Sequence, residues 1–213
     1  MKYYDAIEKN YPEFLLPNLV LDADCKEFAK VFDEPEGCNI LEIGCSDEPL
    51  SYALSDVGFG VIGIDLRSGF IPTGKVINYR FIKGDILFTD IQPIKFKSVI
   101  MMSTLEHVGL GSYGESPVDN GDIRLMDKLY NMLESGGTVY ITVPVGKSSC
   151  NNSWRVYSSS DLQDRVIRKF KVVHQSFFAS GEYLHYKIGD EVRYDDAFTN
   201  TGPEVTTLLK LEK

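Results

Sequence analysis

Polar residues able to hold a small ligand stand directly behind four short apolar runs of this 213-residue chain. Asp65 could accept hydrogen bonds from both hydroxyls of a ribose, and it follows Gly44 by about the 20 residues expected of a ribose-binding acid. Asp85 could accept a hydrogen bond from an exocyclic amine such as that of adenine. Gly44 has no Cβ, so the backbone can pass close beneath a ligand. The four groups are Glu42 to Ser46, Asp65-Leu66, Gly84-Asp85-Ile86 and Ser103 to His107.

The elements that must position these residues follow from the hydrophobic pattern. Short apolar runs alternate with segments of helical periodicity, which predicts strands interleaved with helices. This order favours parallel β-α units in an open sheet with helices on both faces, where ligands bind at the ends of the strands. We predict strands near 38–44, 59–66, 79–86, 96–103, 138–145, 171–178 and 204–212, and helices near 22–33, 46–58, 120–137 and 159–169.

The loop behind the first strand discriminates between cofactors. A dinucleotide site needs a G-x-G-x-x-G loop and the bare N-terminus of a helix beneath its pyrophosphate. Here the loop reads "GCSDEP", and Asp47 and Glu48 would repel a diphosphate. A cofactor with a positive amine and a sulfonium, and with no phosphate, suits this loop better. We therefore expect S-adenosyl-L-methionine and not NAD.

The series "LEIGCS", "VIGIDL", "FIKGDI", "MMSTLEHV" and "LESGGTVYITVP" resembles the S-adenosylmethionine-dependent methyltransferase superfamily over about residues 38–213. The string "EHVGLGSYGESPVDNGD", followed by "VPVG" and "WRVYS", looks like a mostly uncharacterised family within it. The resemblance implies an α/β fold: a Rossmann-like, seven-stranded, mostly parallel sheet with an antiparallel last strand and helices on both faces. The length of 213 residues and the hydrophobic content of 43% allow one well-buried core, so we expect one domain, with an N-terminal helical segment over 1–37 and a core over 38–213.

By this resemblance, Glu42 and Gly44 lie by the methionine end of the cofactor, Asp65 holds the ribose and Asp85 reads the adenine amine. Leu66 and Ile86 would offer apolar faces to the ring. Two departures from the family pattern matter. Further glycines are common where Cys45 to Asp47 stand, and no N-P-P-Y or D-P-P-Y tetrad follows the fourth strand, which disfavours base methylation. The remaining expected cofactor residues are Cys45, Ser46, Gly84 and Ser103.

Candidate catalytic residues follow the fourth strand. In methyl transfer the cofactor carries the reactivity, while the protein supplies alignment, dehydration and sometimes a base. An oxygen acceptor would benefit from a base, and His107 is the leading candidate, with Glu106 beside it. Each could instead serve only to tether the loop. Some relatives place a metal at such a Glu-His pair, but Ser103 stands where a further carboxylate would help, so we expect no metal.

Two segments could contact the acceptor. The loop "VGLGSYGESPVDNGD", with Tyr113 at its middle, is longer than a strand-to-helix connection requires, and such loops are usually functional. "NNSWRVYS" places Trp154, Arg155 and Tyr157 on what we expect to be the same rim, where an indole and a guanidinium could hold a sugar or ring and an anionic group. Alternatively, Trp154 caps the core and Arg155 forms a surface ion pair, and neither contacts the acceptor. Near 181–196, "GEYLHYKIGDEVRYDD" predicts a hairpin insertion that serves as an edge extension, a dimer contact or a lid.

The bulk properties limit the partners. A net charge of −9 argues against a general nucleic-acid binder, and no stretch of 18 apolar residues predicts a membrane span. The charged, aromatic N-terminus does not read as a signal peptide, and four scattered cysteines without a C-x-x-C pair favour a reducing, cytoplasmic location.

The sequence predicts a methyltransferase that acts on a small-molecule acceptor, with a hydroxyl of a sugar, envelope precursor or metabolite expected as the acceptor group. A homodimer is a possible assembly. Three alternatives stay open: a non-catalytic cofactor-binding or regulatory protein with the same fold, an NAD-dependent oxidoreductase, and a protein or RNA methyltransferase.

Overall fold

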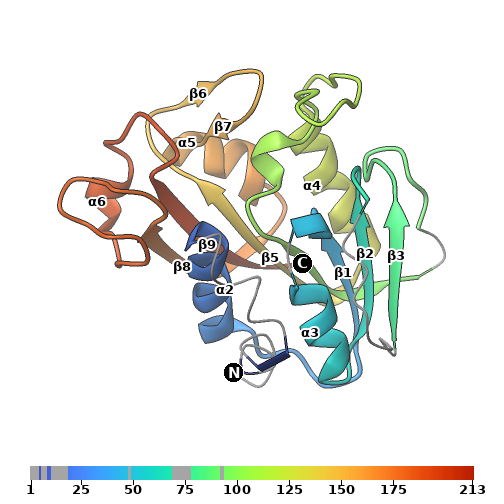
Figure 1. Cartoon of the computed structure of the whole chain (residues 1–213). Helices are drawn as coiled ribbons and strands as arrows, with labels where there is room; N and C mark the ends of the chain where they lie inside the picture. The colour runs from blue at the N-terminus through green and yellow to red at the C-terminus, as the bar shows by residue number, and fades with distance from the viewer. Residues whose placement is uncertain (1–4, 6–8, 11–18, 48, 69–77, 92–93) are drawn as a thin grey trace.

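A seven-stranded sheet organises the chain (Figure 1). The computed structural model describes residues 5, 9–10, 19–47, 49–68, 78–91 and 94–213. The strands are ordered β3-β2-β1-β4-β5-β9-β8, and β9 runs antiparallel to both of its neighbours while the other pairs are parallel. They are β1 (Asn39–Ile43), β2 (Gly60–Asp65), β3 (Tyr79–Lys83), β4 (Phe96–Met101), β5 (Leu133–Pro144), β8 (Lys171–Ala179) and β9 (Val205–Glu212).

Helices cover both faces of this sheet, as the alternating sequence pattern predicts (Figure 1). On one face, α2 (Leu19–Val31) and α3 (Leu50–Asp56) pack through side chains such as Phe28 and Leu54 against Ile40 and Tyr140 of the sheet. On the other face, α4 (Gly121–Met132) and the π-helical segment η4 (Leu162–Ile167), which continues α5 (Ser159–Asp161), bury their apolar sides. The expected fold class is confirmed.

The central strands are continuous apolar runs because helices shield them from water on both sides. In β1 and β4, every residue except the first of β1 and Lys97 is buried. Chain order reverses between these two strands, because β2 and β3 follow on one side of β1 while β4 lies on the other. This is the topological switch point of an open α/β sheet, and ligands bind outside the carboxyl ends of the strands there.

Two expected elements differ from the structure. The helix expected over 120–137 ends at Met132, because Leu133 already has extended backbone angles and begins β5. Gly136, within the range expected to be helical, has a left-handed φ of 67° and lies in that strand. Tertiary pairing with β4, which begins at Leu133 opposite Phe96, outweighs the local helical pattern.

The hairpin expected near 181–196 does not form as two paired strands. Tyr183 and Tyr186 make only an isolated bridge, and α6 (Tyr194–Ala197) begins inside the segment. Its middle instead extends the edge of the sheet: the amide of Ala179 donates to the carbonyl of Asp190 at 2.8 Å, and that of Val192 to Phe177 at 2.8 Å. A short ribbon, β6 (Ser149–Cys150) with β7 (Arg155–Val156), lies beyond β5. Within the described ranges, no helix is long and apolar enough to cross a membrane.

Candidate active site

A cleft opens at the carboxyl ends of β1, β2, β3 and β4, beside the switch point. The empty space between its lining atoms, together with the solvent at its open mouth, is about 850 Å³. Seven of its lining residues are among those expected from the sequence to bind the cofactor: Gly44, Asp65, Leu66, Gly84, Asp85, Ile86 and Ser103. The cleft is also lined by His107 and Tyr113, and by Ile43, Ile64, Arg67, Met102, Thr104, Val108, Gly109 and Glu115, which were not expected.

Gly44 forms the floor where β1 and β4 end side by side. Its amide donates to the carbonyl of Ile64 at 2.9 Å, and its φ of 84° lies in the left-handed region. A Cβ at this position would collide with the side chain of Thr104. Thr104 is itself fixed, since its single hydroxyl proton is shared between the carbonyls of Met102 at 2.9 Å and Ile43 at 3.2 Å. Only glycine fits, for both conformational and steric reasons.

Asp65 presents its carboxylate to the cleft and is held by three donors. The amide of Ser46 donates to Oδ2 at 3.0 Å, and the amide of Arg67 donates to Oδ1 at 2.8 Å. The Arg67 guanidinium reaches the two oxygens at 3.3 Å each. Ser46 therefore touches the site through its backbone: its amide orients Asp65, whose carboxylate lines the cleft.

Asp85 lies on the opposite wall, behind β3. Its Oδ1 accepts from the amide of Leu87 at 2.8 Å, which fixes the turn. Lys128 of α4 holds the same turn from below by donating to the carbonyls of Ile86 and Thr89, both at 2.7 Å. The carboxylates of Asp65 and Asp85 thus line one cleft from neighbouring strand ends.

Two residues expected to touch the cofactor lie beneath the cleft and do not line it. Glu42 is buried and accepts a hydrogen bond from the Ser51 hydroxyl of α3; burial raises the pKa of its carboxyl to about 7. The Cys45 thiol is buried against Gly63, and burial raises its pKa well above the ordinary range. Glu42 belongs to β1 and is turned toward α3, whereas Cys45 lies beyond the strand and begins the 3₁₀ turn η2 (Cys45–Asp47).

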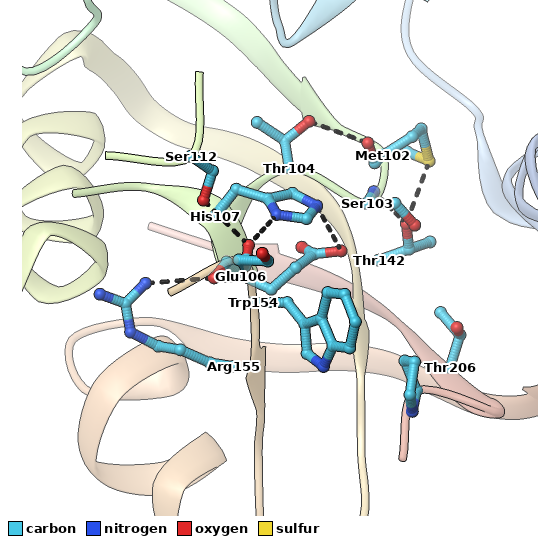
Figure 2. A network of polar contacts seen from close by, with 12 residues as sticks. Met102, Ser103, Thr104, Glu106, His107, Ser112, Thr142, Trp154, Arg155 and Thr206 are labelled. Atoms are coloured by element: carbon cyan, nitrogen blue, oxygen red, sulfur yellow. Dashed lines mark hydrogen bonds and ion pairs between the residues drawn. The ribbon is translucent and has the colours of Figure 1, made fainter. Parts of the chain in front are cut away.

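His107 stands on the cleft wall with its tautomer fixed (Figure 2). Its Nδ1 lies 2.5 Å from the carbonyl of Ser153, which can only accept, so Nδ1 carries the proton. The pKa of the imidazole is lowered by burial, so the ring is neutral near pH 7 and Nε2 keeps its lone pair. Nε2 lies 3.8 Å from Oε1 of Glu106.

Glu106 and Asp24 are buried carboxyl groups behind this wall. Glu106 is 4 % exposed, and burial raises its pKa to about 8. Asp24 reaches over from α2: its Oδ2 accepts from the hydroxyls of Ser103 at 2.7 Å and Thr142 at 2.8 Å. Burial raises the pKa of Asp24 to about 6. Asp24 and Thr142 could not be found from the sequence, because no motif links them to Ser103.

The four expected acceptor contacts separate into two pairs. Tyr113 lines the cleft and packs edge-on against His107, while the Arg67 guanidinium lies 4.9 Å from its ring centre. Trp154 is 38 % exposed and follows Ser153 on the β6–β7 ribbon. The expectation that Arg155 shares an exposed rim is wrong, because it is buried and donates to the carbonyls of Glu106 and Val108.

Tyr157 is likewise buried, and its hydroxyl donates to Asp122 at 3.3 Å. The burial follows from the course of the chain: β7 turns inward beneath the loop behind β4, and Arg155 has an ion-pair contact to Asp122 at 3.9 Å. These two side chains hold the wall in place from behind. Over the described ranges, no group of three or more His, Cys, Asp or Glu side chains is placed to hold a metal ion.

Comparison with known proteins supports the fold. A family model described as "Caenorhabditis protein of unknown function, DUF268" matches residues 89–183, less than half of the chain, which include Glu106, His107 and Trp154. No curated protein sequence matches.

Solved structures match over nearly the whole chain. The N-methyltransferase NodS from Bradyrhizobium japonicum, in complex with S-adenosylhomocysteine, has a TM-score of 0.63 at 14% identity, covering 100% of this chain and 99% of its own. The 1,6-didemethyltoxoflavin-N1-methyltransferase from Burkholderia thailandensis has a TM-score of 0.62 at 12% identity, and the match covers 99% of this chain and 85% of the other. The glycopeptide N-methyltransferase MtfA, complexed with S-adenosylmethionine, has a TM-score of 0.58 at 14% identity, and the match covers 93% of this chain and 96% of the other. The chain has the Rossmann-like fold of the S-adenosylmethionine-dependent methyltransferases.

Proposed function

We propose that this protein is an S-adenosylmethionine-dependent methyltransferase that acts on a small-molecule acceptor. One observation carries the proposal: the ends of β1, β2, β3 and β4 bring Gly44, Asp65, Asp85 and His107 around a single cleft. Each matches one part of the cofactor and its reaction. Similar structures have been solved with S-adenosylmethionine or S-adenosylhomocysteine, although their low identity carries over the fold alone.

The lining residues fit this cofactor by chemistry. Asp65 offers two carboxylate oxygens to a ribose diol, and the guanidinium contacts of Arg67 at 3.3 Å are long enough to yield to it. Asp85 can accept from the adenine amine, and the apolar Leu66 and Ile86 can flank the ring. The carboxylates of Asp47 and Glu48, which would repel a diphosphate, are compatible with the positive sulfonium and ammonium of this cofactor. When bound, the cofactor would supply a methyl group attached to a positive sulfur.

His107 is the proposed base. Its Nδ1–H is engaged by the Ser153 carbonyl, which leaves the Nε2 lone pair free to take a proton from the acceptor. Glu106 lies 3.8 Å from Nε2 and can share that proton. The hydroxyl acceptor expected from the sequence would depend on such a base, because a neutral hydroxyl is a weak nucleophile. Tyr113 and Trp154 are the proposed acceptor contacts at the mouth.

The other candidates have less support. An NAD-dependent oxidoreductase would need a glycine-rich G-x-G-x-x-G loop beneath its pyrophosphate, and the loop behind β1 has only Gly44 of these glycines. A net charge of −9 disfavours RNA as an acceptor. A non-catalytic cofactor-binding protein would keep Asp65 and Asp85 but would not require a free Nε2 at His107.

Calorimetric titration with S-adenosylmethionine, S-adenosylhomocysteine and NAD, run in parallel on the purified protein, tests the proposal. Binding of the first two without NAD is the expected result. Binding of NAD alone would overturn the assignment of the cleft. Failure of all three to bind would leave the fold as an inert scaffold and would end the proposal.

A further inference from the structure

Two buried carboxyl groups, from distant parts of the chain, adjoin the cleft with oxygens that no donor satisfies. Within the described residues, Oδ1 of Asp24 and Oε2 of Glu106 have no hydrogen-bond partner. Both side chains contact cleft-lining residues. Asp24 accepts a hydrogen bond from the Ser103 hydroxyl. Oε1 of Glu106 lies 3.8 Å from Nε2 of His107 (Figure 2). Both acids therefore lie beside the cleft wall that carries His107, the proposed base.

An unsatisfied buried carboxyl oxygen costs stability, so each such atom calls for an explanation. Protonation relieves part of the cost here, since burial raises both pKa values and the charge of Asp24 further raises that of Glu106. The charge of Arg155 lowers the pKa of Glu106, but by less than burial raises it. The Arg155 guanidinium donates to the backbone carbonyls of Glu106 and Val108 and has its ion-pair contact with Asp122. In the part of the chain that the structure describes, no lysine or arginine forms an ion pair with either acid.

We propose that Asp24 and Glu106 form an acidic subsite that binds the amino group of the acceptor, so that the methyl group is transferred to nitrogen. This inference rests on the proposed methyltransferase function and replaces the hydroxyl expected from the sequence. An ammonium has several N–H donors and a positive charge, which match two separate unsatisfied carboxyl oxygens. A hydroxyl donates a single hydrogen bond and leaves one of the two acids unsatisfied.

The subsite also gives the proton a path. The bound ammonium passes one proton to the unprotonated Nε2 of His107, which frees the nitrogen lone pair. That lone pair forms the new C–N bond as the bond between sulfur and the methyl carbon breaks, and the bonding electrons remain on sulfur. The product is a methylated ammonium together with the neutral thioether, so charge and atoms balance. The chain's net charge of −9 favours a cationic acceptor at long range.

The test is binding, so it needs no turnover. Two pairs of probes, benzylamine with benzyl alcohol and glucosamine with glucose, are titrated into the protein saturated with S-adenosylhomocysteine. In at least one pair we expect the amine to bind at least about tenfold tighter than the alcohol. Asp24→Asn and Glu106→Gln, which keep the shape and remove the charge, should each weaken amine binding about tenfold while leaving the affinity for S-adenosylhomocysteine unchanged.

Asp127→Asn is the matched control, because it removes the same charge from an exposed ion pair on α4 and should change neither affinity. Equal binding of amine and alcohol in both pairs, or equal amine binding by Asp24→Asn and the unmodified protein, would overturn the inference while the cofactor proposal stands. If S-adenosylhomocysteine does not bind the unmodified protein, the proposed function fails and the inference fails with it. If a variant does not fold, the comparison of amine with alcohol on the unmodified protein decides.

Discussion

At the scale of single residues, Asp65 is the group whose position the proposed cofactor site depends on most. Its backbone donors, Ser46 and Arg67, define where the two carboxylate oxygens point. The side-chain contacts of Arg67 are longer and can be exchanged for a ribose diol.

Replacement of Asp65 by alanine is therefore expected to weaken S-adenosylhomocysteine binding by about 1.5–3 kcal/mol, the range for hydrogen bonds to a charged group. Calorimetric titration measures the loss, with Asp127→Asn as the control for removal of a surface charge. An unchanged affinity would show that the ribose lies elsewhere.

His107 offers the second prediction at this scale. His107→Gln should lower the rate of methyl transfer about 10²–10⁴-fold, the usual contribution of a positioned base, because the amide has no basic nitrogen at the place of Nε2. The affinity for S-adenosylhomocysteine should stay the same. His174→Gln, on β8, provides the matched control. A normal rate in His107→Gln would reduce His107 to a residue that only tethers the loop to Ser153.

At the scale of elements, the site depends on how closely the ends of β1 and β4 approach. Gly44→Ala introduces a Cβ into the Thr104 side chain and forces an L-residue to a φ of 84°. Gly189→Ala is the matched control, since Gly189 has a φ of 86° with no atom within 4 Å of the added Cβ.

Backbone strain alone costs on the order of 1–3 kcal/mol, so Gly189→Ala should fall in that range and Gly44→Ala should lose clearly more. Chemical denaturation measures both. If the two losses are equal, Thr104 accommodates the added methyl group and the proposed close approach of the strands is wrong.

Much of this element arrangement could be predicted from the sequence, because strand and helix periodicities are local and the parallel order follows from their alternation. Gly44, Asp65 and Asp85 could be found for the same reason: each stands at the end of a run that reads as a strand. Asp24 could not, since its contact with Ser103 spans 79 positions and depends on how α2 packs on the sheet. The burial of Arg155 was missed in the same way, because the direction of β7 is set by tertiary contacts with Glu106, Val108 and Asp122.

The contacts of Asp122 on α4 show how elements are held around the loop behind β4. This buried carboxylate accepts two hydrogen bonds of 2.8 Å from Arg165 of η4 and one from Tyr157. Asp122→Asn removes the charge and leaves the guanidinium of Arg165 without its counterion, so we expect a loss of about 3–5 kcal/mol in the free energy of unfolding.

Asp127→Asn on the same helix breaks only the exposed pair with Lys169 and should cost less than about 1 kcal/mol. Urea denaturation of the two variants compares a buried with an exposed ion pair in one helix. Similar losses for both would mean that Asp122 is not a structural anchor.

At the scale of the whole molecule, the unusual feature is a group of buried acids with raised pKa values. Burial raises the pKa of Asp24 to about 6, that of Glu42 to about 7 and that of Glu106 to about 8. A carboxyl whose pKa is higher in the folded than in the unfolded chain stabilises the fold only while it is protonated. Its contribution is complete at low pH and is lost as the pH rises through the folded-state value.

The melting temperature should therefore fall as the pH is raised from about 5, just above the ordinary carboxyl pKa values, to about 8, the raised pKa of Glu106. Glu106→Gln should flatten the upper part of this decline, because glutamine has no proton to lose there. The repulsion within a chain of net charge −9 also grows with pH, but the variant shares it, so the difference between the two curves isolates Glu106. Glu134→Gln, at an exposed position on β5, removes the same charge and should leave the slope unchanged. Parallel curves for Glu106→Gln and the unmodified protein would mean that Glu106 is ionised throughout this range, and a donor for its Oε2 would then have to exist in the free protein.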